Sequence, residues 1–110
     1  MLDFDQYQRE AGKTAIYPNR LDNLYYPALG LAGEAGEVCE KIKKIMRDKD
    51  GKLNDEDRLL LIKELGDVIW YVSALADELD VYLGSVANAN LEKLRSRQER
   101  GKISGSGDNR

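Results

Sequence analysis

The chain has 110 residues and a mass of 12.4 kDa, with 42% apolar and 34% charged positions, which are the size and balance of one globular domain. Twenty acids against seventeen bases leave a net charge of -3, so a nucleic-acid partner is not expected without a concentrated basic patch. The single cysteine excludes an intrachain disulfide, and the lack of histidine excludes the usual zinc sites and histidine-based catalytic triads.

The N-terminal part of the chain predicts one short helix followed by a long one. Asp3 and Asp5 stand where a secretory signal would carry bases, and no apolar run approaches the roughly 20 residues that span a bilayer. We therefore expect a cytoplasmic protein with no membrane partner. The first helix is expected to begin at one of these acids and to end by 12–14. The long helix is expected from about 21 to 49, although Pro27 and three glycines make its first half a poor helix by propensity alone.

The rest of the chain predicts two further helices. Basic residues crowd the end of the long helix, where the helix dipole favours cations, and a turn is expected to follow. Asn54 is expected to cap the third helix, whose apolar positions recur in steps of four and three as far as Leu79. A last helix is expected over about 83–100, and a disordered polar tail over 101–110. No sustained strand pattern occurs, so we predict a single all-α domain over 1–100, most economically a four-helix antiparallel bundle.

Two pairs of acids stand out by their spacing, Glu34 with Glu37 and Glu64 with Asp67. On a helix, the i, i+3 spacing puts the two carboxylates of a pair about 60° apart on adjoining turns. In each pair the first acid borders the apolar stripe and the second lies farther out on the same flank. Carboxylates so near an apolar interior need a partner, a proton or a metal, because an isolated buried charge is costly. An all-oxygen set suits a hard cation, with Mg²⁺ as the leading candidate.

A simpler explanation of these acids is surface charge. Pairs spaced i, i+3 are common on charged helices, and with twenty acids in the chain a chance pair is expected. Two pairs that both border an apolar stripe are less easily explained in this way. They are also flanked by Gly33, Gly36 and Gly66, which would let another helix or a ligand approach the backbone closely.

The segments around these acids resemble a known family, the all-α MazG-like nucleoside triphosphate pyrophosphohydrolases. Its relatives include dimeric dUTPases and the phosphoribosyl-ATP pyrophosphohydrolases of histidine synthesis. The family pattern is Glu-x-x-Glu on one helix and Glu-x-x-Asp on the next, and the chain has LGLAGEAGEV at 29–38 and KELGDVIWY at 63–71. The segment ANLEKL at 89–94 resembles the family again, and the similarity extends from about Phe4 to Arg97.

The resemblance implies a four-helix, oligomeric NTP pyrophosphatase fold and hydrolysis of a nucleoside triphosphate between its α- and β-phosphates. The products would be a monophosphate and pyrophosphate, with Mg²⁺ as cofactor and Mn²⁺ as a possible substitute. It implies that one set of acids both holds the metal and carries catalysis: Glu34, Glu37, Glu64 and Asp67. Asn90 and Lys93 would hold the nucleotide, and Gln8 would face the base or sugar. Members often carry an acid where this chain has Gly33, so the identity of the general base is left open.

Three bases and one aromatic residue are further candidates for substrate binding. Lys41 lies two turns beyond Glu34 on nearly the same face, and Lys93 and Arg97 are one turn apart on the last helix. Each could meet phosphate oxygens, although a solvated surface is the commoner place for a lysine. Trp70 could stack on the base or simply pack in the core.

A homo-oligomer, either a dimer or a tetramer, is expected because members of the family usually form one. The consecutive apolar residues at 59–62 surround one stretch of the third helix, which a single bundle could not wholly cover, so we predict that this stretch meets another subunit. Two alternative functions stay open: a non-enzymatic helical-bundle interaction or regulatory protein, and a narrow-specificity dUTP or dCTP hydrolase of the same fold. Base choice depends on the shape of a pocket that several helices contribute.

Overall fold

The computed structural model describes the whole chain, from Met1 to Arg110, and is all-α as the sequence predicts. It has four helices: α1 Phe4–Gly12, α2 Tyr25–Lys49, α3 Asp55–Glu78 and α4 Leu83–Glu99. Each expected helix is present within a few residues of its predicted bounds. None of the four combines the length and the apolar character needed to cross a membrane.

Local side-chain caps explain where α1 and α3 begin. Asp3 caps α1 by accepting from the backbone N–H of Gln6, whose side chain in turn accepts from the Asp3 backbone N–H. Asn54 and Asp57 form the same reciprocal capping box at α3. The α2–α3 turn begins at Asp50, which adopts the left-handed conformation that commonly ends a helix. The hairpin of α2 and α3 is therefore bounded by signals that are readable in the sequence.

The long helix α2 begins at Tyr25, four residues later than the sequence predicts, and Pro27 accounts for the difference. Pro27 occupies the first turn of α2, where its missing backbone N–H costs no helical hydrogen bond. Leu21 has a left-handed φ of 72° and so lies outside the helix. The Asn23 side chain accepts from the backbone N–H of Tyr26 at 3.1 Å and so supplies a cap that Leu24 cannot.

The connection between α1 and α2 is held down by one carboxylate at the end of α3. Glu78 accepts from the Tyr17 hydroxyl at 2.7 Å, and from the backbone N–H groups of Leu21 and Asn23 at 2.6 Å each. These charge-assisted bonds fasten a segment without regular structure beside the start of α2.

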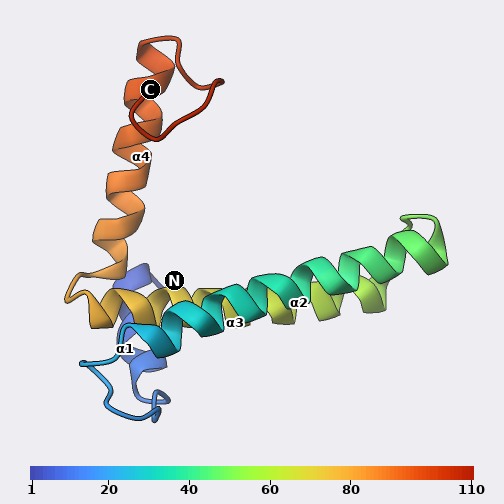
Figure 1. Cartoon of the computed structure of the whole chain (residues 1–110), viewed down its shortest axis with the longest axis horizontal. Helices are drawn as coiled ribbons and strands as arrows, with labels where there is room; N and C mark the ends of the chain where they lie inside the picture. Colours follow the sequence, from blue (N-terminus) through green and yellow to red (C-terminus); the bar gives the residue numbers. More distant parts are fainter.

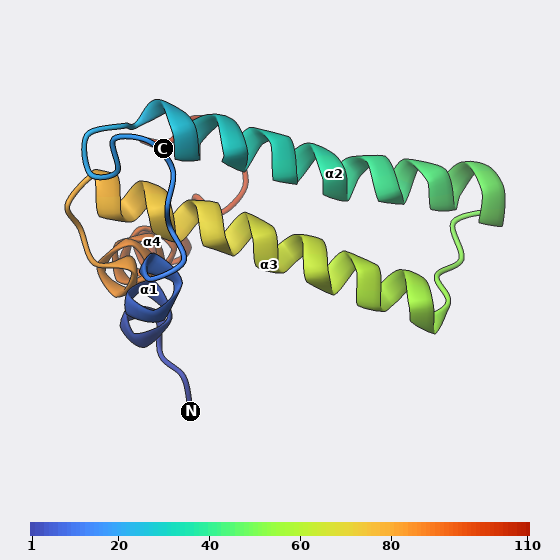
Figure 2. The ribbon, with the colours of Figure 1, turned by 90° about the horizontal axis from the view of Figure 1, so that it is seen from below.

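The four helices form an open arrangement, and not a closed bundle. Figures 1 and 2 show α2 and α3 side by side as a long antiparallel hairpin, with α1 packed across the end of α3 and α4 rising away from the hairpin. Helix α4 contacts α1 and α3 but not α2. The all-α fold class is confirmed, but a single chain does not form the expected bundle of four antiparallel helices. The first turn of α4 is hydrogen-bonded to side chains of α1, and α4 leaves the hairpin at that point.

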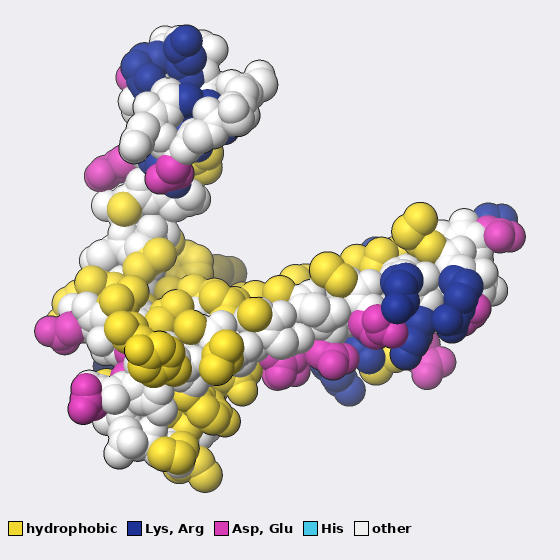
Figure 3. Space-filling view, viewed as in Figure 1, with side chains coloured by type: hydrophobic (Ala, Val, Ile, Leu, Met, Phe, Trp, Pro, Cys, Tyr) yellow, Lys and Arg dark blue, Asp and Glu magenta, His cyan; other side chains and the backbone are white.

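Much of the apolar surface of the chain is uncovered. Only ten residues are buried, and the accessible surface is 8243 Å², against about 6,100 Å² for a compact monomer of this mass. The radius of gyration is 16.7 Å, where a compact domain of this length has about 13 Å. Figure 3 shows hydrophobic side chains spread over the base of the molecule and along one edge of the hairpin. In the predicted contact stretch, Leu59 is 61% and Ile62 56% exposed.

Candidate functional site

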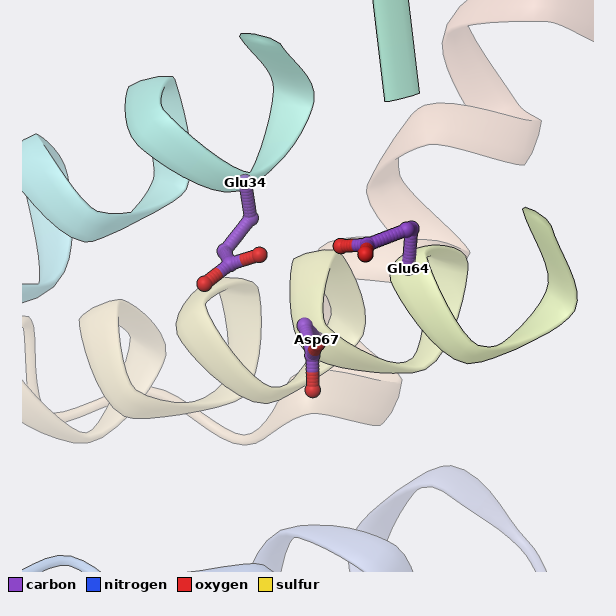
Figure 4. Close-up of side chains that lie close together, drawn as sticks. All are labelled: Glu34, Glu64 and Asp67. Atoms are coloured by element: carbon purple, nitrogen blue, oxygen red, sulfur yellow. The ribbon is translucent and has the colours of Figure 1, made fainter. Parts of the chain in front are cut away.

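Three of the four motif acids converge between the two long helices. Glu34 comes from α2, and Glu64 and Asp67 from α3, and one carboxylate oxygen of each lies within 4.8 Å of the others. Figure 4 shows Glu34 and Glu64 pointing toward one another across the hairpin. Glu34 and Glu64 are half-buried while Asp67 is exposed, which agrees with the positions that helical spacing predicts for these acids.

The three carboxylates repel one another. Burial first, and then the negative charges of Asp67 and Glu64, raise the pKa of Glu34 above its ordinary value. One base lies within ion-pair distance of the cluster: Lys41 Nζ is 3.6 Å from Glu64 Oε1. The negative charge of the cluster is therefore only partly neutralised, which makes it a place for a cation.

Glu37, the fourth motif acid, lies at the rim of this cluster. Its side chain is exposed on α2, and its oxygens are not among those that lie within 4.8 Å of one another. It is still near enough for its charge to contribute to the raised pKa of Glu34. The structure thus brings three motif acids together and leaves the fourth beside them.

An aromatic wall, made of Tyr17, Tyr26, Trp70 and Tyr71, adjoins the acids. The ring of Tyr71 packs so closely on Gly30 that a Cβ atom there would lie 2.1 Å from Tyr71 Cε1. Burial first, then Tyr26, and then the charges of Glu34 and Asp67 raise the pKa of Tyr71. The sequence alone does not identify Gly30 and Tyr71 as a contacting pair. The available signal was that Tyr71 follows Asp67 by one helical turn.

Trp70, the predicted stacking residue, is half-buried at one end of this wall. Its ring meets Tyr71 edge to face, with centroids 5.0 Å apart, and its indole Nε1 donates to Thr14 Oγ1 at 2.8 Å. At the other end Tyr26 stacks on Tyr17 at 4.6 Å. The wall therefore joins α2, α3 and the segment after α1.

In a comparison with known protein families, the chain matches the MazG nucleotide pyrophosphohydrolase domain over residues 27–101. The chain belongs to the MazG family. The matched range contains all four motif acids and the whole of α3 and α4, but not α1. The resemblance in the motif segments is thereby confirmed.

Two curated relatives extend this comparison. The Gene 37 protein of Mycobacterium phage L5 is 54% identical over 114 aligned residues, which cover 99% of this chain and all of that protein. The uncharacterized protein YvdC of Bacillus subtilis strain 168 is 38% identical over 74 residues, which cover 63% of this chain and 70% of that protein. No solved structure matches the chain.

The predicted nucleotide-binding residues of α4 do not join the acids within one MazG chain. Asn90 is exposed on a helix that makes no contact with α2. The 101–110 tail folds back along α4, where the Asp108 carboxylate accepts from Lys93 Nζ at 2.7 Å and from Arg97 Nη2 at 3.2 Å. Arg97 also donates to the Asp108 backbone carbonyl and is buried. Both bases already hold an anion, so their predicted role toward phosphate stays a prediction.

Gln8 lies outside the matched MazG domain and is buried between α1 and the α3–α4 turn. Its Nε2 donates to Asp77 Oδ1 at 2.8 Å and to the Val81 carbonyl at 2.9 Å, and its Oε1 accepts from the Leu83 backbone N–H at 2.8 Å. Both amide hydrogens and the carbonyl oxygen are thus used inside the chain. The predicted contact of Gln8 with a base or sugar stays a prediction.

Proposed function

We propose that this MazG-family protein is a Mg²⁺-dependent pyrophosphohydrolase that cleaves ribo- or deoxyribonucleoside triphosphates between the α- and β-phosphates, releasing a monophosphate and pyrophosphate. The observation that carries the proposal is the convergence of Glu34, Glu64 and Asp67 within 4.8 Å from two facing helices. Membership of the MazG family supports the class of reaction.

The chemistry of the donor set fits a hard divalent cation. All the donors are carboxylate oxygens, which Mg²⁺ and Mn²⁺ prefer over the nitrogen and sulfur ligands of softer metals. Their mutual repulsion, seen in the raised pKa of Glu34, is relieved by a positive charge placed among them. Bound there, Mg²⁺ would offset the charge of the triphosphate and acidify the attacking water.

The side chains of the chain itself bind and orient the substrate. Glu34, Glu64 and Asp67 define where the metal-bearing phosphates lie, with Glu37 at the rim as the fourth acid. Trp70, half-buried at one end of the aromatic wall, would offer a flat apolar surface to the base. Holding the triphosphate between these two features would orient the bond between the α- and β-phosphates for attack.

We infer that the active form is a homo-oligomer. The surface in excess of a compact monomer is about 2,000 Å², and a typical stable interface removes about 800 Å² from each partner. The exposed side chains of Leu59, Leu60 and Ile62 on α3 support a contact there. Because α4 is separated from α2 within one chain, a neighbouring copy is what would bring Asn90 and Lys93 to an acidic cluster.

The direct test is a substrate panel. The full chain is incubated with Mg²⁺ and each canonical NTP and dNTP, and both pyrophosphate and orthophosphate are measured. We expect pyrophosphate release, which Glu64→Gln or Asp67→Asn abolishes while the helical circular dichroism stays unchanged. Glu40→Gln is the matched control, because Glu40 pairs with Lys43 and Lys44 on the same face of α2 and is not part of the cluster.

The panel also separates the alternatives. Activity confined to dUTP or dCTP would identify a narrow hydrolase of the same fold. Release of orthophosphate alone, or pyrophosphate release that survives both cluster variants, contradicts the proposed site. No reaction with any nucleotide would favour the helical interaction protein.

A further inference from the structure

Lys41 reaches across the hairpin to the acidic cluster although a partner is available on its own helix. Glu37 precedes Lys41 by four residues, the arrangement in which an acid and a base stabilise a helix best. The structure instead pairs Lys41 Nζ with Glu64 Oε1 of α3, and Glu37 forms no ion pair with it. Lys41 therefore pairs with an acid of the cluster in preference to the acid on its own helix.

The contact is loose in comparison with the other cross-helix ion pair of the hairpin. Lys49 Nζ lies 2.8 Å from Asp57 Oδ1 and donates hydrogen bonds to both carboxylate oxygens. Lys41 lies 3.6 Å from Glu64 and donates no hydrogen bond to it. Its side chain is 32% exposed, so its ammonium can move into solvent without opening the hairpin.

The neighbouring bases of α2 have partners of their own. Lys43 and Lys44 both pair with Glu40, at 2.9 and 3.7 Å. Lys41 is therefore the base that balances the cluster, and a divalent cation there would compete with it directly for Glu64. Two positive charges cannot share one carboxylate without repulsion.

We propose that Lys41 is an exchangeable counter-ion of the acidic cluster, which pairs with Glu64 in the metal-free protein and leaves it when a divalent cation binds. The released ammonium is then free for an anionic ligand such as a phosphate oxygen. The exchange couples the two binding events, because a cation that takes the place of Lys41 at Glu64 makes the ammonium more available to an anion. This inference rests on the cation site of the proposed function.

The test is Mn²⁺ binding to the full chain without nucleotide. Binding is measured by isothermal titration calorimetry and by the electron paramagnetic resonance signal of free Mn²⁺. Lys41→Met removes the competing charge, so we expect it to tighten Mn²⁺ binding by about three- to tenfold. Lys41→Gln, a second neutral variant, should do the same. Lys44→Met is the matched control and should leave Mn²⁺ affinity unchanged, because Lys44 pairs with Glu40.

Unchanged or weaker Mn²⁺ binding in both Lys41 variants would overturn the exchange. In the hydrolysis assay the same variants should raise KM, because the cation site is retained while one base that meets the triphosphate is lost. The two proposals fail in different ways. If the Lys41 variants bind Mn²⁺ more tightly but the parent chain hydrolyses no nucleotide, the counter-ion role of Lys41 stands and the proposed enzymatic function is rejected.

Discussion

The backbone N–H of Leu83, at the start of α4, donates to Gln8 Oε1 of α1 at 2.8 Å across 75 positions of sequence. One residue later, the Gly84 N–H donates to Asp5 Oδ1 at 2.9 Å. The first turn of α4 has no cap from its own side chains, so α1 supplies the missing acceptors. The start of α4 is thus held in place by two side chains at the other end of the chain.

Gln8→Ala should destabilise the protein by about 2–4 kcal/mol, because it leaves the buried Leu83 N–H and the part-buried Val81 carbonyl without their partner. Urea unfolding measures the change. Gln98→Ala, an exposed glutamine on α4, should stay within about 0.5 kcal/mol of the parent. Equal unfolding midpoints for the two variants would show that Gln8 does not anchor α4.

The raised pKa of Glu34 predicts a pH dependence of the metal-free protein. A carboxyl with a higher pKa in the folded state binds its proton more tightly there, so stability is lost as pH rises from 4.5 through the folded pKa. Glu34→Gln removes this loss, so in EDTA its Tm should exceed that of the parent at pH 7, and the difference should vanish below pH 4.5. Thermal unfolding in EDTA between pH 4 and 8 provides the measurement.

Glu40→Gln is a control for which the expected change in Tm has the opposite sign. The hydrogen bond from Lys43 lowers the pKa of Glu40, so its charged form stabilises the fold above the ordinary carboxyl pKa. This variant should therefore lower Tm at pH 7. If both variants shifted Tm in the same direction, the charge repulsion within the cluster would not be the cause.

Gly30→Ala should cost about 1–3 kcal/mol, because the added methyl would overlap the Tyr71 ring and force it from its place. Gly36→Ala is matched to it: its added methyl meets nothing within 4 Å, and alanine is the better helix former by about 0.5–1 kcal/mol. Denaturant unfolding should thus show opposite signs for the two. Equal stabilisation by both variants would mean that Tyr71 does not pack on Gly30.

Asp108→Asn tests whether Lys93 and Arg97 bind phosphate. Removing this carboxylate charge frees Lys93 and leaves Arg97 with only its bond to the Asp108 backbone carbonyl, so KM for the triphosphate should fall by about two- to fivefold, the range of an exposed ion pair, while kcat is retained. Steady-state kinetics measure this, with Asp22→Asn, an exposed acid without an ion pair, as the control. A KM equal to that of the control would remove the two bases from the substrate site.

The exposed leucine and isoleucine of α3 test the oligomer. Light scattering at micromolar concentration should give a multiple of 12.4 kDa for the parent chain. Leu59→Glu with Ile62→Glu should reduce the mass, because two carboxylates would be buried in the contact. Lys63→Glu, on the same helix, should leave the assembly intact. A monomeric parent chain would contradict the expected interface.

The sequence by itself determined what depends on neighbours within a helical turn. Asn54 begins α3 as predicted, because a cap needs only the backbone three residues on. The half-buried positions of Glu34 and Glu64 follow from their angle to the apolar stripe, which the helical repeat sets. The side of its helix on which each of these acids lies was therefore predictable without any knowledge of how the helices pack.

Tertiary structure alone decided which side chains meet across helices. Lys41 pairs with Glu64 and not with Glu37, and Gln8 forms hydrogen bonds with Asp77, Val81 and Leu83. Each of these contacts joins segments that are far apart in sequence, and its distance depends on where and at what angle two helices cross. Periodicity gives the direction in which a side chain points, but only packing gives the separation to what it faces. For this reason the half-buried positions of Glu34 and Glu64 were predictable from the sequence, while the pairing of Lys41 with Glu64 and the path of α4 were not.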